Sequence, residues 1–557
     1  MPLAAASGRP PTSSDEFRPW NCRHRAPVHD ICFNRGNSAG GGWGDAMIVQ
    51  FNVRDFLDRA ESAYPDRQAV IDEPDQPAAS WGTMTFAQMA ERARAQAAGL
   101  DALDIAPGDR VAVVSHNSAR LLTSFFGVCG WGRTLVPINF RLAPAEVEYI
   151  VEHSGASAVL IDPELDDVLA DIKAPQRFVM GDDTDPILYP TGAEPRGWEG
   201  NEEATATINY TSGTTARPKG VQLTHRNCWV NATVFGWHAQ VSDRDVYLHT
   251  LPMFHANGWG MPWATTGMGC PQVALRKVDG TEILHRVDRH GVTLLCAAPA
   301  VVNAVLDALP TWEGTVPGRD KTRIIVAGAP PPSRTIERIE AELGWEFIQI
   351  YGLTETAPLL TINRQRAEWD DLSSGERARK LMRAGAPALG TELSISAEGE
   401  VLARSNTVMA GYWRQPDATE SAMDGGWFHT GDGGLLDDEN HLQILDRKKD
   451  VIITGGENVS SIEVEDAIFS LTGVAEVAVI GIPHDTWGEM VTALVVTDDG
   501  VTITEEHVIT HCRTLLAGYK CPKQVEFRDE LPRTATGKLQ KFRLRAPYWE
   551  GYERQVN

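Results

Sequence analysis

Long apolar runs are missing from this chain of 557 residues. A membrane-spanning helix needs roughly eighteen consecutive apolar residues, and the best candidate, residues 121–131, is short and interrupted by Gly127 and Gly130. The N-terminal "MPLAAASGRPPTSSDEF" contains acids and lacks the apolar segment of a secretory signal. The sequence therefore predicts no integral membrane segment and a cytoplasmic location.

Cysteine and basic residues are also scarce. The eight cysteines are scattered without a Cys-x-x-Cys pair, which favours a reducing compartment over a disulfide scaffold. Lys and Arg number 51 against 75 Asp and Glu, so the formal net charge is −24. Nucleic acid and anionic membranes both require a basic face, and neither is expected as the main partner.

The length exceeds that of a single hydrophobic core and predicts about two to four domains. Residues 1–46 are dominated by Pro, Ser, Gly and Arg without apolar periodicity, so we expect a disordered extension. Within it, Cys22, His24, His29 and Cys32 match no standard zinc spacing. We interpret them as incidental rather than as a metal site.

From about residue 80 the sequence alternates helical and strand patterns. Residues 85–100 have helical apolar spacing, and short buried-strand runs recur as "RVAVVSH", "AVLID", "RFVMG", "TLLCAAP" and "RIIVAGAP". After residue 446 the pattern changes to short strands around helices. We predict the α/β class, with a large N-terminal domain of several sheet subdomains over residues 47–446 and a small α+β domain over residues 450–557.

A polar loop, "YTSGTTARPKG" at residues 210–220, separates two strand-like stretches. Its glycines can turn N–H groups toward an anion, while Ser212, Thr214 and Thr215 add hydroxyl donors and Lys219 adds a charge. The Walker order is absent, and a second strand is expected before a helix capped by Thr224. Alone, the loop fits either an anion-binding cradle or a hairpin turn.

Four further motifs follow the loop: "YGLTETAP" (351–358), "GWFHTGD" (426–432), "LDRKKDVIITGGENVSSIEVE" (445–465) and "LPRTATGKLQK" (531–541). In order and spacing, the five motifs resemble those of the adenylate-forming (AMP-binding) superfamily, over about residues 47–545. The segments "MFHANGWG" and "GWFHTGDGGLLDDENHLQILDRKKD" are most similar to acyl-CoA synthetases, the fatty-acid–CoA ligase family, among them medium-chain and methylmercaptopropionyl-CoA ligases.

This resemblance implies an AMP-forming acid–thiol ligase. A fatty or related apolar carboxylic acid would react with MgATP to give an acyl-adenylate, from which CoA would then displace AMP. ATP, Mg²⁺ and CoA are the implied cofactors, and the small C-terminal domain would be mobile about a hinge at residues 447–449. The resemblance leaves a homodimer open.

The superfamily's functional residues map onto this sequence where its motifs match. Catalysis is implied for Lys538, Glu355, Thr354 and His255, with Glu355 and Thr354 also holding Mg²⁺. Contacts to ATP or CoA are implied for Thr211, Ser212, Gly213, Thr214, Thr215, Lys219, Gly328, Ala329, Pro330, Tyr351, Gly352, Asp432, Arg447, Lys449 and Gly456. The acyl pocket would include Trp259, Met261 and Trp263.

The residue types suit these roles. A cation such as Lys538 can screen the repulsion between a carboxylate and an α-phosphate, and Glu355 offers the oxygen ligand that Mg²⁺ prefers. Asp432, expected after a tight turn, can accept bonds from two ribose hydroxyls, and Arg447 is a bidentate donor.

Near the predicted hinge, local structure can be assigned from the residues. "VIIT" is expected as a strand and "GGEN" as a turn. A helix should follow, with Ser460 and Glu463 forming a capping box.

Several alternatives stay open. Ala216 stands where the superfamily usually has glycine, which would cost on the order of 1 kcal/mol if that position has positive φ. Residues 251–269 fit an apolar acyl pocket, but also a buried core helix. An enzyme loading a separate carrier protein, a luciferase-like monooxygenase or a catalytically silent nucleotide-binding protein would share the motifs.

Overall fold

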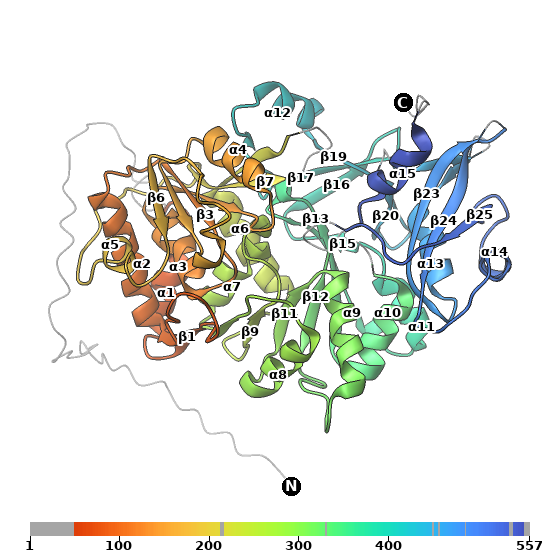
Figure 1. Cartoon of the computed structure of the whole chain (residues 1–557), viewed down its shortest axis with the longest axis horizontal. Coiled ribbons are helices and arrows are strands. Elements are labelled where there is room, and N and C mark those ends of the chain that lie inside the picture. Colours follow the sequence, from red (N-terminus) through yellow and green to blue (C-terminus); the bar gives the residue numbers. More distant parts are fainter. Residues whose placement is uncertain are drawn as a thin grey trace, which may run out of the picture. The chain divides into compact units, whose positions relative to one another are not determined.

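The computed structural model describes residues 49–211, 217–328, 331–447, 450–454, 457–484, 486–533 and 539–550. The extension predicted for residues 1–46, with its four ligand-type residues, lies outside these ranges. Within them the chain forms four β-sheets with flanking helices (Figure 1). No helix in the described ranges is long and apolar enough to cross a membrane.

The largest sheet contains, in spatial order, β15 (Ala386–Pro387), β14 (Leu359–Arg364), β13 (Glu346–Gly352), β12 (Arg323–Val326), β11 (Leu294–Ala297), β9 (Tyr247–His249), β10 (Gln272–Ala274), β1 (Gln68–Ile71) and β2 (Thr83–Thr85). Its strands are parallel from β13 to β1 and antiparallel at both edges. The central strands are short buried runs such as "LLCA", as expected for parallel strands covered on both faces.

A second sheet contains, in spatial order, β18 (Gly411–Tyr412), β8 (Lys219–Thr224), β7 (Thr205–Thr211), β4 (Thr134–Ile138), β3 (Arg110–Val114), β5 (Ala158–Ile161) and β6 (Gln176–Val179). The strands from β6 to β7 are parallel, whereas β8 and β18 join antiparallel. The strand predictions in the two sheets are confirmed at β3, β5, β6, β11 and β12.

The helices associated with these sheets are α1 (Asp55–Ala63), α2 (Phe86–Ala102), α3 (Ala119–Gly127), α4 (Pro144–Ser154), α5 (Asp185–Leu188), α6 (His225–His238), α7 (Met261–Gly267), α8 (Gly280–His290), α9 (Pro299–Ala308), α10 (Ser333–Arg338), α11 (Ser374–Leu381) and α12 (Pro416–Ala422). The helix predicted at residues 85–100 is α2, whose start is fixed by a capping box between Thr85 and Gln88. Thr224 caps α6 as predicted, accepting a bond from the Asn227 N–H.

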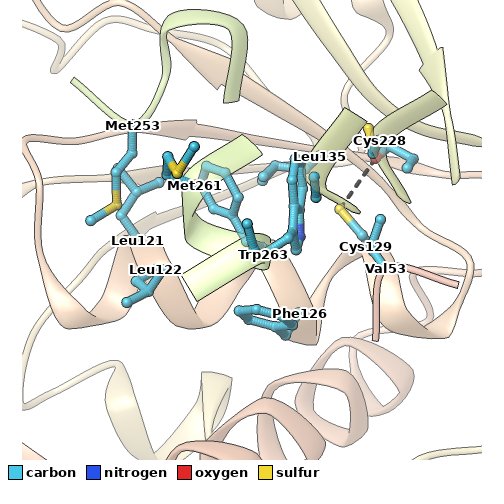
Figure 2. Packing of buried hydrophobic residues seen from close by; sticks show 14 of the residues in the cluster. Val53, Leu121, Leu122, Phe126, Cys129, Leu135, Cys228, Met253, Met261 and Trp263 are labelled. Atoms are coloured by element: carbon cyan, nitrogen blue, oxygen red, sulfur yellow. Dashed lines mark hydrogen bonds between the residues drawn. The ribbon is translucent and has the colours of Figure 1, made fainter. Parts of the chain in front are cut away.

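The main hydrophobic core includes the buried residues of α3 and α7. Figure 2 shows Leu121 and Phe126 of α3 close to Met261 and Trp263 of α7. Burying each such side chain contributes about 1.5–3 kcal/mol relative to leaving it exposed. The six cysteines in the described part of the chain are buried free thiols. They therefore contribute to stability by packing in the core and not by cross-linking.

Toward the C-terminus lie two smaller sheets. One contains β16 (Thr391–Ile395), β17 (Glu400–Ser405), β19 (Phe428–Leu436) and β20 (Leu442–Arg447). The other contains β22 (Glu457–Val459), β21 (Ile452–Thr454), β24 (Gly488–Thr497) and β23 (Val474–His484), with β25 (Gln524–Phe527) also paired to β24. With α13 (Ser461–Phe469), α14 (Glu505–Leu515) and α15 (Lys541–Trp549) it forms the small α+β domain, which has its own core.

Two local predictions in this domain need correction. Ser460 caps α13 by accepting a bond from the Glu463 N–H at 3.4 Å, but no reciprocal side-chain bond is present between these described residues. The Glu463 carboxylate instead pairs with Lys520 at 2.7 Å, so only half of the capping box forms. The predicted turn "GGEN" is also too long, because Glu457 already pairs with Thr454 in the β21–β22 ladder.

Candidate active site

The β7–β8 hairpin carries both ends of the predicted phosphate loop. Its strands are antiparallel, with Tyr210 opposite Gly220 and Thr211 opposite Lys219. The loop residues between them lie outside the described ranges: Ser212, Gly213, Thr214, Thr215 and Ala216. The structure thus brings Thr211 and Lys219 together, and the phosphate contacts of the loop stay a prediction.

Lys219, Tyr412 and Glu355 form a contact cluster beside this hairpin. The Tyr412 hydroxyl donates a hydrogen bond to the Glu355 carboxylate at 3.0 Å. The Lys219 ammonium lies 4.7 Å from the centroid of the Tyr412 ring. Pairing of β18 with β8 holds Tyr412 opposite Val221, and the Glu355 carbonyl accepts a bond from the Met409 N–H at 2.8 Å. Strands β8 and β18 therefore position the cation and the hydroxyl, and the turn that contains Glu355 supplies the carboxylate.

The acidity of Glu355 reflects opposing influences. Desolvation raises the pKa of the Glu355 carboxyl, while the Tyr412 hydrogen bond and the Lys219 charge oppose that rise. Burial and the neighbouring carboxylate in turn raise the pKa of Tyr412. Tyr412 therefore stays protonated and remains a donor to Glu355.

The residues predicted to hold Mg²⁺ fit a cation that arrives with a nucleotide. Mg²⁺ is usually bound through one or two carboxylates together with substrate phosphates rather than by an all-protein cage. Thr354 and Glu355 are adjacent in a short helical turn, η6 (Thr354–Thr356). Within the described residues no group of three or more His, Cys, Asp or Glu side chains could hold a metal alone. One carboxylate beside a threonine hydroxyl matches the phosphate-assisted mode.

Tyr351 and Asp432 link the largest sheet to the β16–β20 sheet. The Tyr351 hydroxyl donates to the Asp432 carboxylate at 2.8 Å, and in the β19–β20 ladder Asp432 lies opposite Arg447. Asp432 was expected after a tight turn, but it lies inside β19. The preceding Gly431 has φ of +73° and is absorbed as an irregularity within that strand, because its N–H bonds the Glu400 carboxylate at 2.9 Å.

Two predicted glycines have clear backbone reasons. A Cβ on Gly352 would lie 1.6 Å from the Pro358 carbonyl oxygen, so only glycine fits there. Gly328, which follows β12, has φ of +102°. Its neighbours Ala329 and Pro330 lie outside the described residues.

The segment between β9 and α7 has unusual backbone. His255, which is half-buried, opens η3 (His255–Gly260), in which Ala256, Asn257 and Trp259 all have positive φ. Left-handed backbone costs about 1–2 kcal/mol per non-glycine residue. The Trp259 side chain is 4% exposed, so apolar burial offsets part of that strain.

The other two predicted pocket residues are core residues. Met261 and Trp263 are 0% and 1% exposed, and the Trp263 ring centroid lies 5.3 Å from that of Phe125. Both belong to the cluster of Figure 2. The alternative of a buried core helix thus describes α7, and contact with an acyl group stays a prediction for Trp259, Met261 and Trp263.

Several predicted residues are not placed. Lys538, Lys449 and Gly456 lie outside the described residues, as does the side chain of Arg447. Their roles therefore remain predictions.

Tyr412 was missed by the sequence analysis. It lies in "GYW" at residues 411–413, outside the five motifs. The sequence signal at this position is limited to a glycine followed by two aromatic residues. Tyr412 also lines an open hollow of about 540 Å³ with Gln222, Ala410, Gly411, Arg414, Gln415, Pro416, Thr419 and Glu420.

A large α/β domain with a small α+β domain, and a carboxylate–cation cluster at a strand hairpin, fit the class of adenylate-forming enzymes. The family model "AMP-binding enzyme" matches residues 57–413 and the model "AMP-binding enzyme C-terminal domain" matches residues 463–538. The chain belongs to the AMP-binding enzyme family.

Named relatives narrow the class. The chain is 36% identical over 530 residues to 4-hydroxybutyrate–CoA ligase 2 of Metallosphaera sedula, covering 88% of this chain and 93% of the relative. It is 35% identical to a 2-methylpropanoate–CoA ligase of Humulus lupulus, covering 88% and 94%. Among solved structures, a Mycobacterium tuberculosis fatty acyl CoA synthetase is 34% identical with a TM-score of 0.67, covering 90% and 99%. The chain is an AMP-forming acid–thiol ligase, and use of ATP and CoA fits its family.

Proposed function

We propose that this ligase activates a fatty or related apolar carboxylic acid as an acyl-adenylate and transfers the acyl group to CoA. The observation that carries the proposal is the contact cluster of Lys219, Tyr412 and Glu355 at the end of the β7–β8 hairpin. It joins a cation for phosphate oxygens to a carboxylate suited to Mg²⁺.

In the first half-reaction a substrate carboxylate oxygen bonds to the α-phosphorus of ATP. The bond from that phosphorus to the bridging oxygen breaks, and pyrophosphate leaves with the electron pair. Lys219 binds phosphate oxygens, and Lys538 screens the repulsion between the two anions. Mg²⁺, held by Glu355 and Thr354, would neutralise charge on the phosphates. Positioning and charge screening supply most of the catalysis.

In the second half-reaction the CoA thiolate attacks the acyl carbon. The bond from that carbon to the adenylate oxygen breaks, and AMP leaves carrying one oxygen of the original acid. For this step the small domain turns about Lys449, removing Lys538 and bringing Gly456 to the thiol. These domain roles rest on the motif resemblance.

The apolar substrate class is supported by the sequence around η3 and α7. Residues 251–269 are rich in Trp and Met, a composition that suits an alkyl or aryl chain better than an amino acid if they line the acyl pocket. The relatives' names include 4-hydroxybutyrate, 2-methylpropanoate and trans-cinnamate. Chain length is therefore the property to measure.

The experiment measures pyrophosphate release from MgATP across straight-chain acids of increasing length, with branched, hydroxy, aryl and thioether acids, with and without CoA. We expect one class to give CoA-dependent turnover. Lys538→Ala should lower pyrophosphate release about 10²–10³-fold, because it removes the cation between the reacting anions. ATP binding without pyrophosphate release from any acid would contradict the proposal and favour a silent nucleotide-binding protein.

The acceptor is tested in the same assay. Release that occurs equally without CoA, followed by acyl transfer to a carrier protein only, would favour a carrier-loading enzyme. Cell fractionation tests the proposed cytoplasmic location, since some relatives are named peroxisomal. Light scattering tests a homodimer.

A further inference from the structure

Two aromatic side chains of α4 lie beside the β7–β8 hairpin. Tyr149 and His153 are four residues apart, so they share one face of the helix. Their rings are stacked with centroids 5.3 Å apart. In Figure 1, α4 lies next to β7.

His153 contacts the strand that enters the phosphate loop. Its Nδ1 shares a hydrogen bond with the Tyr210 hydroxyl at 2.8 Å, and the two rings meet edge to face. The His153 carbonyl accepts a bond from the Trp413 indole N–H at 3.2 Å. One residue of α4 thus contacts both the end of β7 and the neighbour of Tyr412.

Tyr149 contacts the chain that leaves the loop. The Arg217 guanidinium lies 5.4 Å from the centroid of the Tyr149 ring, and the Tyr149 hydroxyl donates to the Pro218 carbonyl at 3.4 Å. The next residue is Lys219. The contact between Tyr149 and Pro218 therefore lies one residue before Lys219, the cation of the site.

The hairpin itself leaves little room for adjustment. A Cβ on Gly220 would lie 3.0 Å from Cζ of Tyr210, so the Tyr210 ring rests against the backbone of β8. Tyr210 is paired with Gly220 across the ladder, so we expect a shift of Tyr210 to act on Gly220 and on its neighbour Lys219.

We propose that Tyr149 and His153 are positioning residues for MgATP: they fix both ends of the β7–β8 turn and so set where Lys219 and Tyr412 stand relative to Glu355. Preorganising these groups avoids the entropy of ordering them when nucleotide binds. The inference rests on the proposed adenylation, and neither α4 residue is expected to touch a substrate.

The test uses the full-length enzyme and separates MgATP from the other substrates. His153→Leu and Tyr149→Leu should each lower kcat/KM for MgATP about fivefold to tenfold, the effect of losing a hydrogen bond or a ring contact. KM for the acid and for CoA should stay within about twofold of wild type. His153→Gln, which can still bond Tyr210, and Tyr149→Phe, which keeps the ring, should restore most of the loss. Glu152→Gln, an exposed change on the same helix, is the matched control.

MgATP kinetics within about twofold of wild type in both leucine variants would overturn the proposal. Equal losses for all three substrates, with a lowered melting temperature and no rescue, would also overturn it, because those indicate a folding role. If the leucine variants do not fold, Tyr210→Phe removes only one hydroxyl and is expected to act on MgATP alone. If the wild type releases no pyrophosphate, the proposed function fails instead, and calorimetric MgATP affinities of the same variants then decide the positioning role.

Discussion

At the scale of single residues, opposing effects act on the pKa of the Glu355 carboxyl. Loss of hydration raises the pKa of its carboxyl, whereas the Tyr412 hydroxyl and the Lys219 charge favour the ionised form. Only the ionised carboxylate is a good ligand for Mg²⁺. The cluster therefore makes adenylation depend on pH through Glu355, with activity falling as the pH drops and this carboxyl is protonated.

Tyr412→Phe should move the acid limb of kcat/KM for MgATP to higher pH. The variant loses the donor that stabilises the Glu355 carboxylate, so the pKa of Glu355 rises further and the proton is retained to higher pH. The loss of activity should be larger at acid than at alkaline pH. The measurement is a pH profile of pyrophosphate release, which reports ionisations of the free enzyme.

Tyr519→Phe provides the control for this profile, since it removes a hydroxyl from an exposed tyrosine. The control profile should match wild type. An unchanged or downward-shifted acid limb in Tyr412→Phe would show that Glu355 is not the group whose ionisation limits activity.

At the scale of elements, the local sequence pattern predicted secondary structure well where the spacing of apolar residues matches the residues that are buried. The apolar runs that became β3, β5 and β11 are buried parallel strands. Asp432 was misjudged because glycine normally signals a turn, while here Gly431, with positive φ, lies inside β19 and its N–H bonds the Glu400 carboxylate. Half of the Ser460 capping box failed because a distant lysine takes the Glu463 carboxylate. Such competition between partners far apart in sequence has no local signature.

The candidate site also contains both residues that a local motif indicates and residues whose place depends on contacts far apart in sequence. Lys219, Glu355, Tyr351 and Asp432 could be singled out because each lies in a motif that resembles the superfamily's, and their roles stay predictions. Tyr412 could not, because its role depends on β18 pairing with β8.

Helix α7 gives an element-scale prediction. Trp263→Ala should destabilise the large domain by about 3–5 kcal/mol, because it removes a fully buried ring packed on Phe125. Trp237, near the end of α6, is 66% exposed. Trp237→Ala should therefore change the free energy of unfolding by less than about 0.5 kcal/mol. Chemical denaturation followed by tryptophan fluorescence measures both. A Trp263→Ala protein with wild-type stability and an altered acid preference would contradict the core assignment and support a pocket wall.

At the scale of the whole molecule, the protein has a net charge of −24. The substrates proposed for it, ATP, CoA and a carboxylic acid, are also anions. At physiological salt, screening limits the distance over which most surface charges interact to about 8–10 Å. The local cation Lys219 therefore matters more to a bound phosphate than the net charge does. A protein this acidic can bind nucleotides when fixed N–H groups and a few cations are placed at one hairpin.

The adenylate itself can be tested by following one oxygen atom. The preferred acid, labelled with ¹⁸O in its carboxylate, is incubated with MgATP, CoA and the enzyme, and the nucleotide products are analysed by mass spectrometry. Attack of the carboxylate on the α-phosphorus, followed by thiolysis at the acyl carbon, leaves one ¹⁸O on AMP and one on the thioester. Formation of ADP with the label in inorganic phosphate would mean an acyl-phosphate route, and would contradict an AMP-forming ligase.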